Sequence, residues 1–453
     1  MSDYGLIGEK LGHSFSTFLH WEFKNPEYEL MEIPRDSVDE YLTKAEFKGI
    51  NVTIPYKETA IKYCIPDETA VKIGCVNTLV RKDSGDGDKP LVYGYNTDCL
   101  GFKYMLDREG ISLSAKNIVI LGTGGTSKTA GYVCASEGAS SITVVSRKKF
   151  SPESDVNGDT ENDAKERNVA KSGTKIEYIT YDELNSGRCK NAEVLINTTP
   201  VGMYPNNYAC PVDISIFDKL EGVVDVIYNP LVTALVYEAK RRGIKATCGL
   251  PMLVAQAYYA EQLFFDGEIH TEDSKGLKNS EIERVIENVS KEKQNIVLVG
   301  MPGCGKSTQG RLLSCRFDRD YIDTDVVFKE KTGISAGDYI TQYGEQAFRD
   351  EETLVVKDVA KNSGVIIATG GGSILRPENV DALKMNGKII YLYRPKEQLS
   401  VKNRPLSQNG RLDELYKVRC PIYESIADVK ISVKKTPEET LEEILKIYEN
   451  TCD

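Results

Sequence analysis

The sequence predicts an α/β protein with largely parallel sheets, divided into more than one domain. Short runs rich in β-branched residues alternate with longer stretches of helical periodicity through almost the whole chain, which is typical of α/β units. At 453 residues the chain is too long for one ordinary hydrophobic core. A content of 40% hydrophobic and 28% charged residues is that of a globular protein, and disorder is not expected.

Composition and charge exclude several classes of function. The net charge of −11 opposes binding to nucleic acid, because a phosphate backbone is held by clustered Lys and Arg. The 11 cysteines include no C-x-x-C pair, which argues against a zinc ribbon or a dense disulfide framework. The N-terminus has no export signal, and no segment approaches 18 consecutive apolar residues. We therefore expect a cytoplasmic protein without a membrane or nucleic-acid partner.

The first 110 residues form the first predicted lobe. Strands are expected at 4–8 (YGLIG), 28–33 (YELMEI) and 51–54 (NVTI). A hairpin-like pair follows at 75–82 (CVNTLVRK) and 91–96 (LVYGYN), joined by the turn-rich DSGDGDKP. These segments predict an α/β lobe.

A new β-strand at 117–121 (NIVIL) predicts the start of a nucleotide-binding fold of the Rossmann type. A glycine-rich turn of the form G-x-G-x-x-S follows this strand, and a helix is expected from Ser127 to Glu137. Such a turn lets backbone N–H groups and a helix N-terminus meet a pyrophosphate. The predicted cofactor-binding residues here are Gly122, Gly124, Gly125, Thr126 and Ser127.

The residues after the next strand, 141–146 (SITVVS), indicate which dinucleotide binds. Where a ribose-selecting Asp or Glu is expected about 20 residues after the turn, the chain has Ser146, Arg147, Lys148 and Lys149. Cations at this position suit a 2′-phosphate, so we expect NADP(H) and not NAD. The alternative is that they are ordinary exposed charges.

A new nucleotide fold is expected near residue 295. The polar tract 151–173 is interpreted as a surface helix between loops, and 278–293 as the last helix of the preceding domain. After the strand NIVLV comes GMPGCGKS at 300–307, which has the pattern of a phosphate-binding P-loop for ATP with Mg²⁺. The predicted contacts are Gly303, Cys304, Gly305, Lys306, Ser307 and Thr308.

Six motifs in order make the first part resemble the shikimate dehydrogenase family. They are GHSFS at 12–16, GINVTIPYKE at 49–58, GCVNT at 74–78, GYNTD at 94–98, INTTPVGM at 196–203 and GLPMLVAQA at 249–257. The resemblance implies a dehydrogenase over 1–292, with a substrate lobe at about 1–105 and 250–292 and an NADP-binding Rossmann domain at about 106–249. Thr17 departs from the family, which usually has Pro there.

The resemblance also implies the roles of the first site. Lys57 follows one predicted strand and Asp98 ends another, so both side chains can enter one cleft and share a proton relay. In the family this pair is catalytic, Ser14 and Ser16 bracket the substrate carboxylate, and Thr53, Asn77 and Gln256 contact ring hydroxyls. The alternatives are a surface salt bridge for the charged pair and satisfied structural groups for the amides.

The remaining residues resemble shikimate kinase, with a P-loop NMP-kinase-like α/β domain at 293–453. The matching pieces are DTD at 323–325, FRDEE at 348–352, ATGGGS at 368–373, RPLS at 404–407 and RCPIYESIAD at 419–428. The family usually has a further Arg before RPL, where this chain has only Lys402, and the lid between Arg404 and Arg419 is short.

For the second site the resemblance implies a complete set of roles. Ser307 and Asp323 would hold Mg²⁺, and Asp325 would contact the accepting hydroxyl. Arg349 and Arg419 would grip the substrate carboxylate, which suits planar guanidinium groups. Gly370, Gly371 and Gly372 would allow close approach of the backbone to the ring. Lys306 and the lid residue Arg404 would stabilise the transferring phosphoryl group. The alternative for the three arginines is exposed surface charge.

The two resemblances together imply a bifunctional enzyme of the shikimate pathway. NADPH would reduce 3-dehydroshikimate to shikimate, and ATP would then phosphorylate shikimate to shikimate 3-phosphate. Two alternatives stay open: a first domain that favours quinate, and a ligand-sensing regulatory protein without catalysis. The second alternative predicts loss of catalytic residues, but Lys57, Asp98, Lys306, Asp323 and Asp325 are all present.

Overall fold

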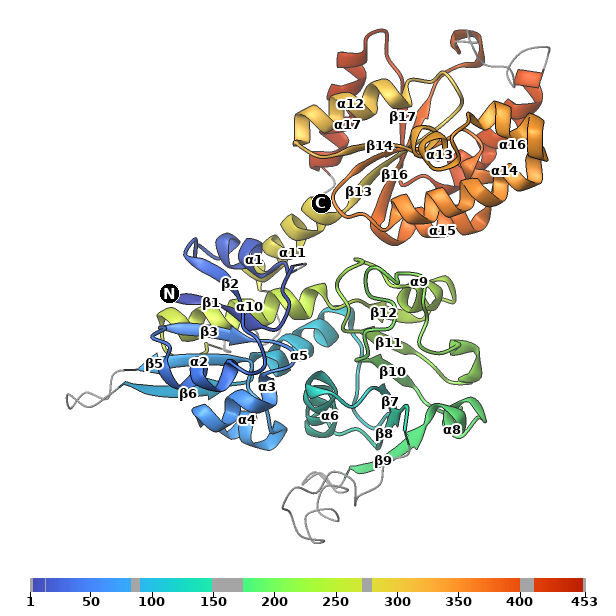
Figure 1. Ribbon diagram of the computed structural model, residues 1–453. Helices are drawn as coiled ribbons and strands as arrows, with labels where there is room; N and C mark the ends of the chain where they lie inside the picture. The colour runs from blue at the N-terminus through green and yellow to red at the C-terminus, as the bar shows by residue number, and fades with distance from the viewer. Residues whose placement is uncertain are drawn as a thin grey trace. The chain divides into compact units, whose positions relative to one another are not determined.

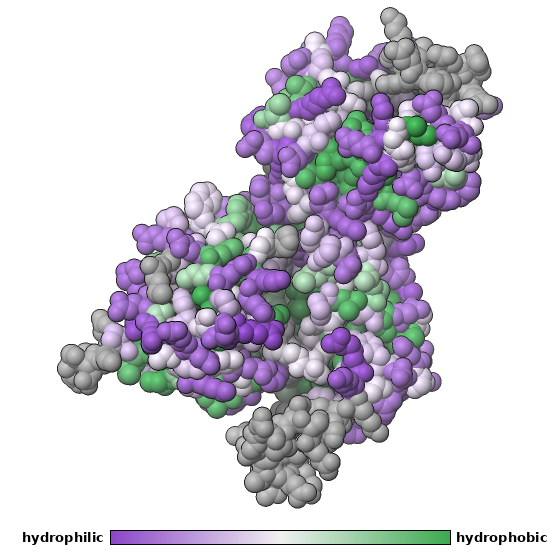
Figure 2. Space-filling view, in the orientation of Figure 1, coloured by the Kyte–Doolittle hydropathy of each residue, from purple (hydrophilic) through white to green (hydrophobic). Residues whose placement is uncertain are grey.

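The computed structural model describes residues 3–12, 14–82, 90–148, 174–270, 279–399 and 411–450. The chain divides into two compact units, Met1–Val289 and Ser290–Asp453. The predicted boundary after residue 292 lies close to this division. Among the described residues, no helix is both long and apolar enough to cross a membrane. Figure 2 shows that hydrophilic residues predominate on the visible face of each unit.

The first unit begins with a mixed sheet whose strand order is β2-β1-β3-β5-β6-β4. Strands β1, β2 and β3 are mutually parallel, and β5 runs antiparallel to both β3 and β6. Each predicted strand of this lobe has a counterpart, including the antiparallel pair, but β3 spans Gly49–Val52 where 51–54 was predicted, and β5 begins at Thr78 where residue 75 was predicted. Its elements are β1 Tyr4–Gly8, α1 Ser16–Glu22, β2 Tyr28–Glu32, α2 Val38–Lys44, β3 Gly49–Val52, α3 Lys57–Ala60, β4 Ile65–Pro66, α4 Glu68–Ile73, β5 Thr78–Lys82 and β6 Leu91–Tyr95.

The second sheet of this unit is parallel throughout, with the order β12-β11-β10-β7-β8-β9. Such a sheet, with helices in its crossovers, is the arrangement predicted for dinucleotide binding. Its elements are α5 Thr97–Glu109, β7 Asn117–Leu121, α6 Gly125–Ser136, β8 Ser141–Ser146, β9 Lys175–Thr180, α8 Tyr181–Asn185, β10 Val194–Asn197, β11 Gly222–Asp225, α9 Ala234–Arg241 and β12 Lys245–Thr247. The surface helix predicted within 151–173 lies outside the described residues.

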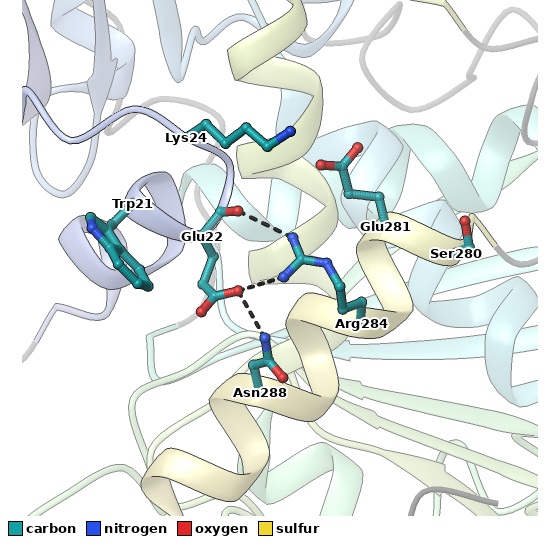
Figure 3. Close-up of a pocket in the computed structure, with 7 residues that line it drawn as sticks. All are labelled: Trp21, Glu22, Lys24, Ser280, Glu281, Arg284 and Asn288. Atoms are coloured by element: carbon teal, nitrogen blue, oxygen red, sulfur yellow. Dashed lines mark hydrogen bonds and ion pairs between the residues drawn. The ribbon is translucent and has the colours of Figure 1, made fainter.

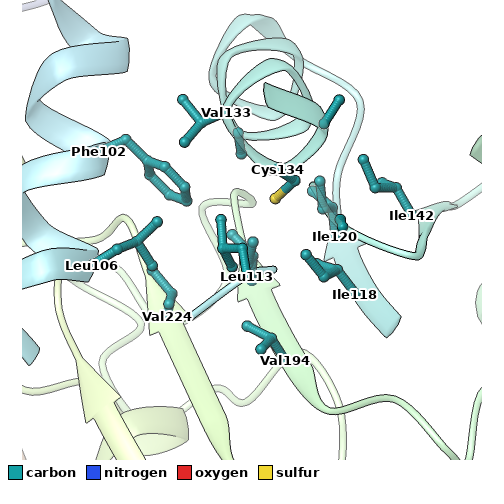
Figure 4. Packing of buried hydrophobic residues seen from close by; sticks show 14 of the residues in the cluster. Phe102, Leu106, Leu113, Ile118, Ile120, Val133, Cys134, Ile142, Val194 and Val224 are labelled. Atoms are coloured by element: carbon teal, nitrogen blue, oxygen red, sulfur yellow. The ribbon is translucent and has the colours of Figure 1, made fainter. Parts of the chain in front are cut away.

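One face of this parallel sheet packs on α5 and α6 (Figure 4). Phe102 and Leu106 of α5 contact side chains from the strands, and Val133 and Cys134 of α6 close the cluster. Phe102 is fully buried, and truncating such a side chain to Ala typically costs about 3–5 kcal/mol. The core therefore fixes α5, which carries Asp98, against the nucleotide-binding sheet.

Two long helices follow, α10 Leu250–Phe265 within the first unit and α11 Ser280–Lys293, which begins in the first unit and ends four residues beyond Val289. The helix predicted at 278–293 is confirmed, and its buried residues are the four apolar positions that predict it, Ile282, Val285, Ile286 and Val289. On its outer side, Arg284 and Asn288 donate to the Glu22 carboxylate at 2.7 and 2.8 Å. Figure 3 shows these bonds in a hollow between α1 and α11. They fix α11 to the helix that begins at Ser16.

The second unit is a parallel sheet of order β14-β15-β13-β16-β17. Helices lie on both sides of it (Figure 1), and β13 is fully buried. Its elements are β13 Asn295–Val299, α12 Lys306–Phe317, β14 Tyr321–Asp323, α13 Thr324–Thr332, α14 Ala336–Ala360, β15 Ile366–Ala368, α15 Pro377–Asn386, β16 Gly387–Tyr393, α16 Arg411–Ile426, β17 Val429–Ser432 and α17 Pro437–Asn450. The predicted α/β class is confirmed in both units.

Candidate active sites

Lys57 and Asp98 form an ion pair in the first unit. Lys57 is the first residue of α3, two residues after Pro55. Its Nζ donates to Asp98 Oδ2 at 2.5 Å, and the two side chains are only 15% and 9% exposed. One sequence expectation is wrong here: Asp98 does not end a strand. β6 stops at Tyr95, and the Asn96 side chain caps α5 by accepting from the Cys99 N–H, which places Asp98 in the first turn of the helix.

Two of the predicted amides adjoin this pair. Asn77 Nδ2 donates to Asp98 Oδ1 at 2.9 Å and lies 3.4 Å from Gln256 Oε1. Gln256 comes from α10, which can approach α5 closely because Gly101 has no side chain. A Cβ at Gly101 would lie 2.5 Å from the Met252 carbonyl oxygen and 3.1 Å from Gln256 Cβ. Side chains from four separate segments, around Lys57, Asn77, Asp98 and Gln256, thus gather at this partly buried ion pair.

The predicted serine pair and Thr53 have fewer contacts that relate them to the Lys57–Asp98 pair. Ser14 Oγ donates to Ser16 Oγ at 3.0 Å, where α1 begins. Phe15 between them packs on Tyr228, with ring centroids 5.1 Å apart. Thr53 follows β3, and its N–H donates to the Ile7 carbonyl oxygen at 2.9 Å. No hydrogen bond among the described residues joins these three hydroxyl groups to Lys57 or Asp98.

Sequence reasoning missed Asn51 and Tyr228. Asn51 is buried, accepts a hydrogen bond from the Tyr28 hydroxyl at 2.7 Å, and donates to Thr78 Oγ1 at 3.0 Å beside Asn77. It stands in the same NVT motif as Thr53, so the motif itself contained the signal. Tyr228 lies in a loop after β11, where no periodic pattern marks it.

The loop with Tyr228 is held by a buried carboxylate. Asp225 Oδ1 accepts from the Ile227 N–H at 3.1 Å, and Oδ2 accepts from Thr233 Oγ1 at 2.8 Å. Burial raises the pKa of Asp225 to about 6. The nucleotide-binding half therefore supplies an aromatic ring that packs on Phe15, the residue between the two serines.

The predicted dinucleotide turn lies against Lys57. Gly122 has φ 107°, which favours glycine, and Gly124 caps α6 with open space where a Cβ would stand. A Cβ at Gly125 would lie 3.9 Å from Lys57 Cδ. Thr126 and Ser127 fall in the first turn of α6, and Ser127 Oγ closes the turn by donating to the Gly122 carbonyl oxygen at 2.7 Å. A dinucleotide whose pyrophosphate binds at the start of this helix would lie close to the Lys57–Asp98 pair.

The predicted selector residues sit at the end of β8. Ser146 is its last residue, and its hydroxyl donates to the Lys148 carbonyl oxygen, which closes a tight turn. Arg147 and Lys148 are exposed, and within the described ranges neither side chain has a hydrogen-bond or ion-pair partner. Lys149 lies outside those ranges. Two cations without a partner among the described residues therefore stand where a 2′-phosphate is expected.

In the second unit, residues 300–307, called the phosphate loop below, join β13 to α12. Gly303 and Gly305 have φ of 85° and 108°, and Gly305 is the N-cap of the helix. Cys304 is buried, and a Cβ at Gly300 would lie 2.9 Å from its Sγ. The helix begins at Lys306, two residues before the expected Thr308. Lys306 Nζ donates to the Gly300 carbonyl oxygen at 2.9 Å, so the lysine folds over its own loop.

The predicted magnesium ligands meet beside this loop. Ser307 Oγ donates to Asp323 Oδ2 at 3.0 Å, and Tyr321 donates to the same oxygen at 2.9 Å. The described residues contain no cluster of three or more His, Cys, Asp or Glu side chains suited to a metal ion. Mg²⁺ does not need such a cluster, because it usually takes one or two protein oxygens together with phosphates and water. The oxygens of Ser307 and Asp323 fit that requirement.

Arg349 and Arg419 converge on residues 370–372, called the glycine turn below. A Cβ at Gly372 would lie 2.7 Å from both terminal nitrogens of Arg349, and one at Gly371 would lie 3.4 Å from Arg419 Nη1. Arg349 is paired with Glu352 at 2.6 Å. Arg419 is 6% exposed, and its Nε has no hydrogen-bond partner in the described part of the chain. Burial, and the nearby charge of Arg349, lower the pKa of Arg419.

A buried guanidinium with an unpaired N–H is costly unless a ligand completes it. Arg419 is such a group, and its convergence with Arg349 on a turn of small residues fits a carboxylate ligand. Asp325 borders the same turn, because a Cβ at Gly370 would lie 2.8 Å from its Oδ1, and Thr324 Oγ1 accepts from the Gly370 N–H at 2.9 Å. The predicted lid residue Arg404 lies outside the described residues.

Comparison with known proteins supports the family resemblance of both halves of the chain. Residues 6–79 match the shikimate dehydrogenase substrate binding domain, and residues 302–449 match shikimate kinase. The NADP(+)-dependent shikimate dehydrogenase of Clostridium beijerinckii is 35% identical over 287 residues, which is 61% of this chain and 97% of that protein. The chain belongs to the shikimate dehydrogenase family, with a shikimate kinase domain fused at its C-terminal end.

Solved structures support the same assignment. Shikimate dehydrogenase 1 from Peptoclostridium difficile is 32% identical, with a TM-score of 0.51, and the match covers 64% of this chain and 97% of that chain. A chorismate mutase/shikimate 5-dehydrogenase fusion protein from Clostridium acetobutylicum gives a TM-score of 0.51 at 33% identity, with the same coverage. The family matches and the dehydrogenase relatives together confirm the predicted fusion and its two enzyme classes. The predicted cofactors fit these classes, NADP for the dehydrogenase and ATP with Mg²⁺ for the kinase.

Proposed function

We propose that the protein catalyses two consecutive reactions, reduction of 3-dehydroshikimate to shikimate with NADPH and phosphorylation of shikimate to shikimate 3-phosphate with ATP. The observation that carries this proposal is that each unit has its own set of reactive groups. The Lys57–Asp98 pair lies at 2.5 Å beside a dinucleotide turn, and Ser307–Asp323 lies at 3.0 Å beside a phosphate loop. The hydroxyl made by the first reaction is the acceptor of the second.

In the first reaction the residues of the Lys57–Asp98 site control one proton. Bound NADPH supplies the hydride, and the oxygen of the reduced carbonyl must gain a proton. Lys57 donates that proton, and Asp98 keeps the ammonium directed at the substrate. Asn77, which donates to Asp98, holds the carboxylate in place. Ser14 and Ser16 bind the substrate carboxylate, while Thr53 and Gln256 contact the ring hydroxyls.

In the second reaction the protein positions two substrates and stabilises charge. ATP with Mg²⁺ supplies the phosphoryl group. Lys306 moves from the Gly300 carbonyl to the phosphates, and Ser307 and Asp323 hold the metal. Arg349 and Arg419 bind the carboxylate of shikimate, and this turns the accepting hydroxyl toward Asp325. Arg404 covers the transferring group from the lid.

A coupled assay tests the proposal as a whole. Purified protein is given 3-dehydroshikimate, NADPH and MgATP, and shikimate 3-phosphate is measured by mass spectrometry together with NADPH oxidation. We expect both, with phosphorylated product absent when NADPH is omitted. Oxidation of NADPH without any phosphorylated product would remove the second half of the proposal.

The choice of cofactor gives a separate prediction. Replacing Arg147 with Asp should raise the KM for NADPH by on the order of 10- to 100-fold, because it removes a charge-assisted contact to the 2′-phosphate. The KM for NADH should change little, since NADH has no such phosphate. Lys175→Asp, an equal charge change at an exposed position on the neighbouring strand β9, is the control. Equal losses for both cofactors would contradict the assignment.

A further inference from the structure

Tyr423 contacts both substrate-binding segments of the kinase unit. It lies on α16, one turn after Arg419, and its side chain is fully buried. Its hydroxyl oxygen is 3.0 Å from the carbonyl oxygen of Gly300, at the start of the phosphate loop. The same oxygen is 2.5 Å from the carbonyl oxygen of Gly371, in the glycine turn. One hydroxyl group therefore stands between the predicted ATP site and the predicted shikimate site.

This hydroxyl can satisfy only one of the two carbonyls fully. A phenol has a single proton to donate, and burial raises the pKa of Tyr423, so the proton stays on the oxygen. The ring itself has little freedom, because it stacks on Tyr391 with centroids 5.0 Å apart and an interplanar angle of 22°. Rotation about the C–O bond of the phenol decides which carbonyl oxygen accepts its hydrogen bond.

The choice depends on Lys306. In the structure Lys306 Nζ donates to the Gly300 carbonyl oxygen at 2.9 Å, so this acceptor is satisfied without the tyrosine. The Tyr423 hydroxyl then donates its hydrogen bond to the Gly371 carbonyl oxygen, the closer of the two acceptors. When Lys306 turns to the phosphates of a nucleotide, the buried Gly300 carbonyl loses its donor. Leaving such an acceptor unpaired is unfavourable, and Tyr423 is already within reach of it.

We propose that Tyr423 is a positioning residue that couples nucleotide binding at the phosphate loop to the conformation of the glycine turn. Movement of Lys306 onto phosphate draws the tyrosine proton toward Gly300 and releases Gly371. Arg349 and Arg419 both pack on that turn, so its release changes how the carboxylate of shikimate is held. The inference rests on the proposed roles of Lys306 and the two arginines.

The experiment is an initial-rate matrix of the kinase reaction on the full-length protein. Shikimate and MgATP are varied together without NADP, and ADP release is followed, so that shikimate binding at the dehydrogenase site gives no signal. The matrix yields the factor by which one substrate changes the affinity for the other. Coupling between sites is on the order of 5- to 150-fold in proteins, and we expect the parent to fall in or near this range. Tyr423→Phe should bring the factor close to one.

Tyr391→Phe is the matched control. It removes another buried hydroxyl from the same ring stack, one whose partner is Cys420 Sγ, and it should leave the coupling factor unchanged. Both variants keep the aromatic ring, and thermal unfolding checks that they fold. A parent factor of one, or an equal factor in Tyr423→Phe, would overturn the inference. Absence of any shikimate-dependent ADP release from the parent would instead overturn the proposed function.

Discussion

Replacing Lys57 with Ala should lower the rate of hydride transfer by on the order of a hundredfold or more, because it removes the proton donor of the first reaction. Asp98 would remain in a partly buried place without its partner, which lies at 2.5 Å in the parent. NADPH oxidation with 3-dehydroshikimate measures the loss. Phosphorylation of added shikimate should continue at close to the parent rate, since separate sites without shared partners behave independently.

Lys62→Ala is the control for this prediction. Lys62 is an exposed lysine in the same segment as Lys57, so its loss tests for a general effect of charge or helix content. Both activities should be measured on one preparation whose fold is checked by circular dichroism. A parallel collapse of both activities in folded Lys57→Ala would show that the two reactions share a site or an obligatory step.

Local patterns in the sequence predicted the architecture well. The strand at 117–121 and the dinucleotide turn after it are local signals, and the helix at 280–293 has apolar residues at helical spacing. The ends of helices and strands were predicted less well where a capping side chain or a proline ring determines them. Asn96 caps α5 and so moves Asp98 into a helix. Pro55, which has no N–H to donate, follows a strand that ends at Val52 and not at Ile54.

The sequence names candidate residues for both sites but does not predict their contacts. Motifs name Lys57, Asp98, Asn77 and Gln256, yet only packing of α10 on α5 brings Gln256 to the pair. That approach depends on Gly101, which no periodic pattern singles out. Tyr423 stands within a predicted motif, but its role follows from two carbonyl groups far away in sequence. Long-range contacts of this kind have no local signal.

The phosphate loop supplies the second large expected effect. Lys306 is the only Lys or Arg within the loop GMPGCGKS, and in the structure its Nζ is already at the loop, 2.9 Å from the Gly300 carbonyl oxygen. A lysine at this position acts on charge that develops during transfer, where a preorganised cation is most effective. Its loss cannot be replaced by Arg349 or Arg419, which pack against the glycine turn.

Lys306→Ala should therefore lower the turnover number for shikimate phosphorylation by on the order of a hundredfold to a thousandfold. Hydride transfer should stay at the parent rate, because the dehydrogenase groups all belong to the first unit. Lys329→Ala, an exposed lysine on α13 of the same unit, is the control and should keep both activities. The measurement is ADP release with saturating shikimate and MgATP, beside NADPH oxidation on the same sample. Phosphorylation by Lys306→Ala at near the parent rate would show that another group carries the charge of the transferring phosphoryl.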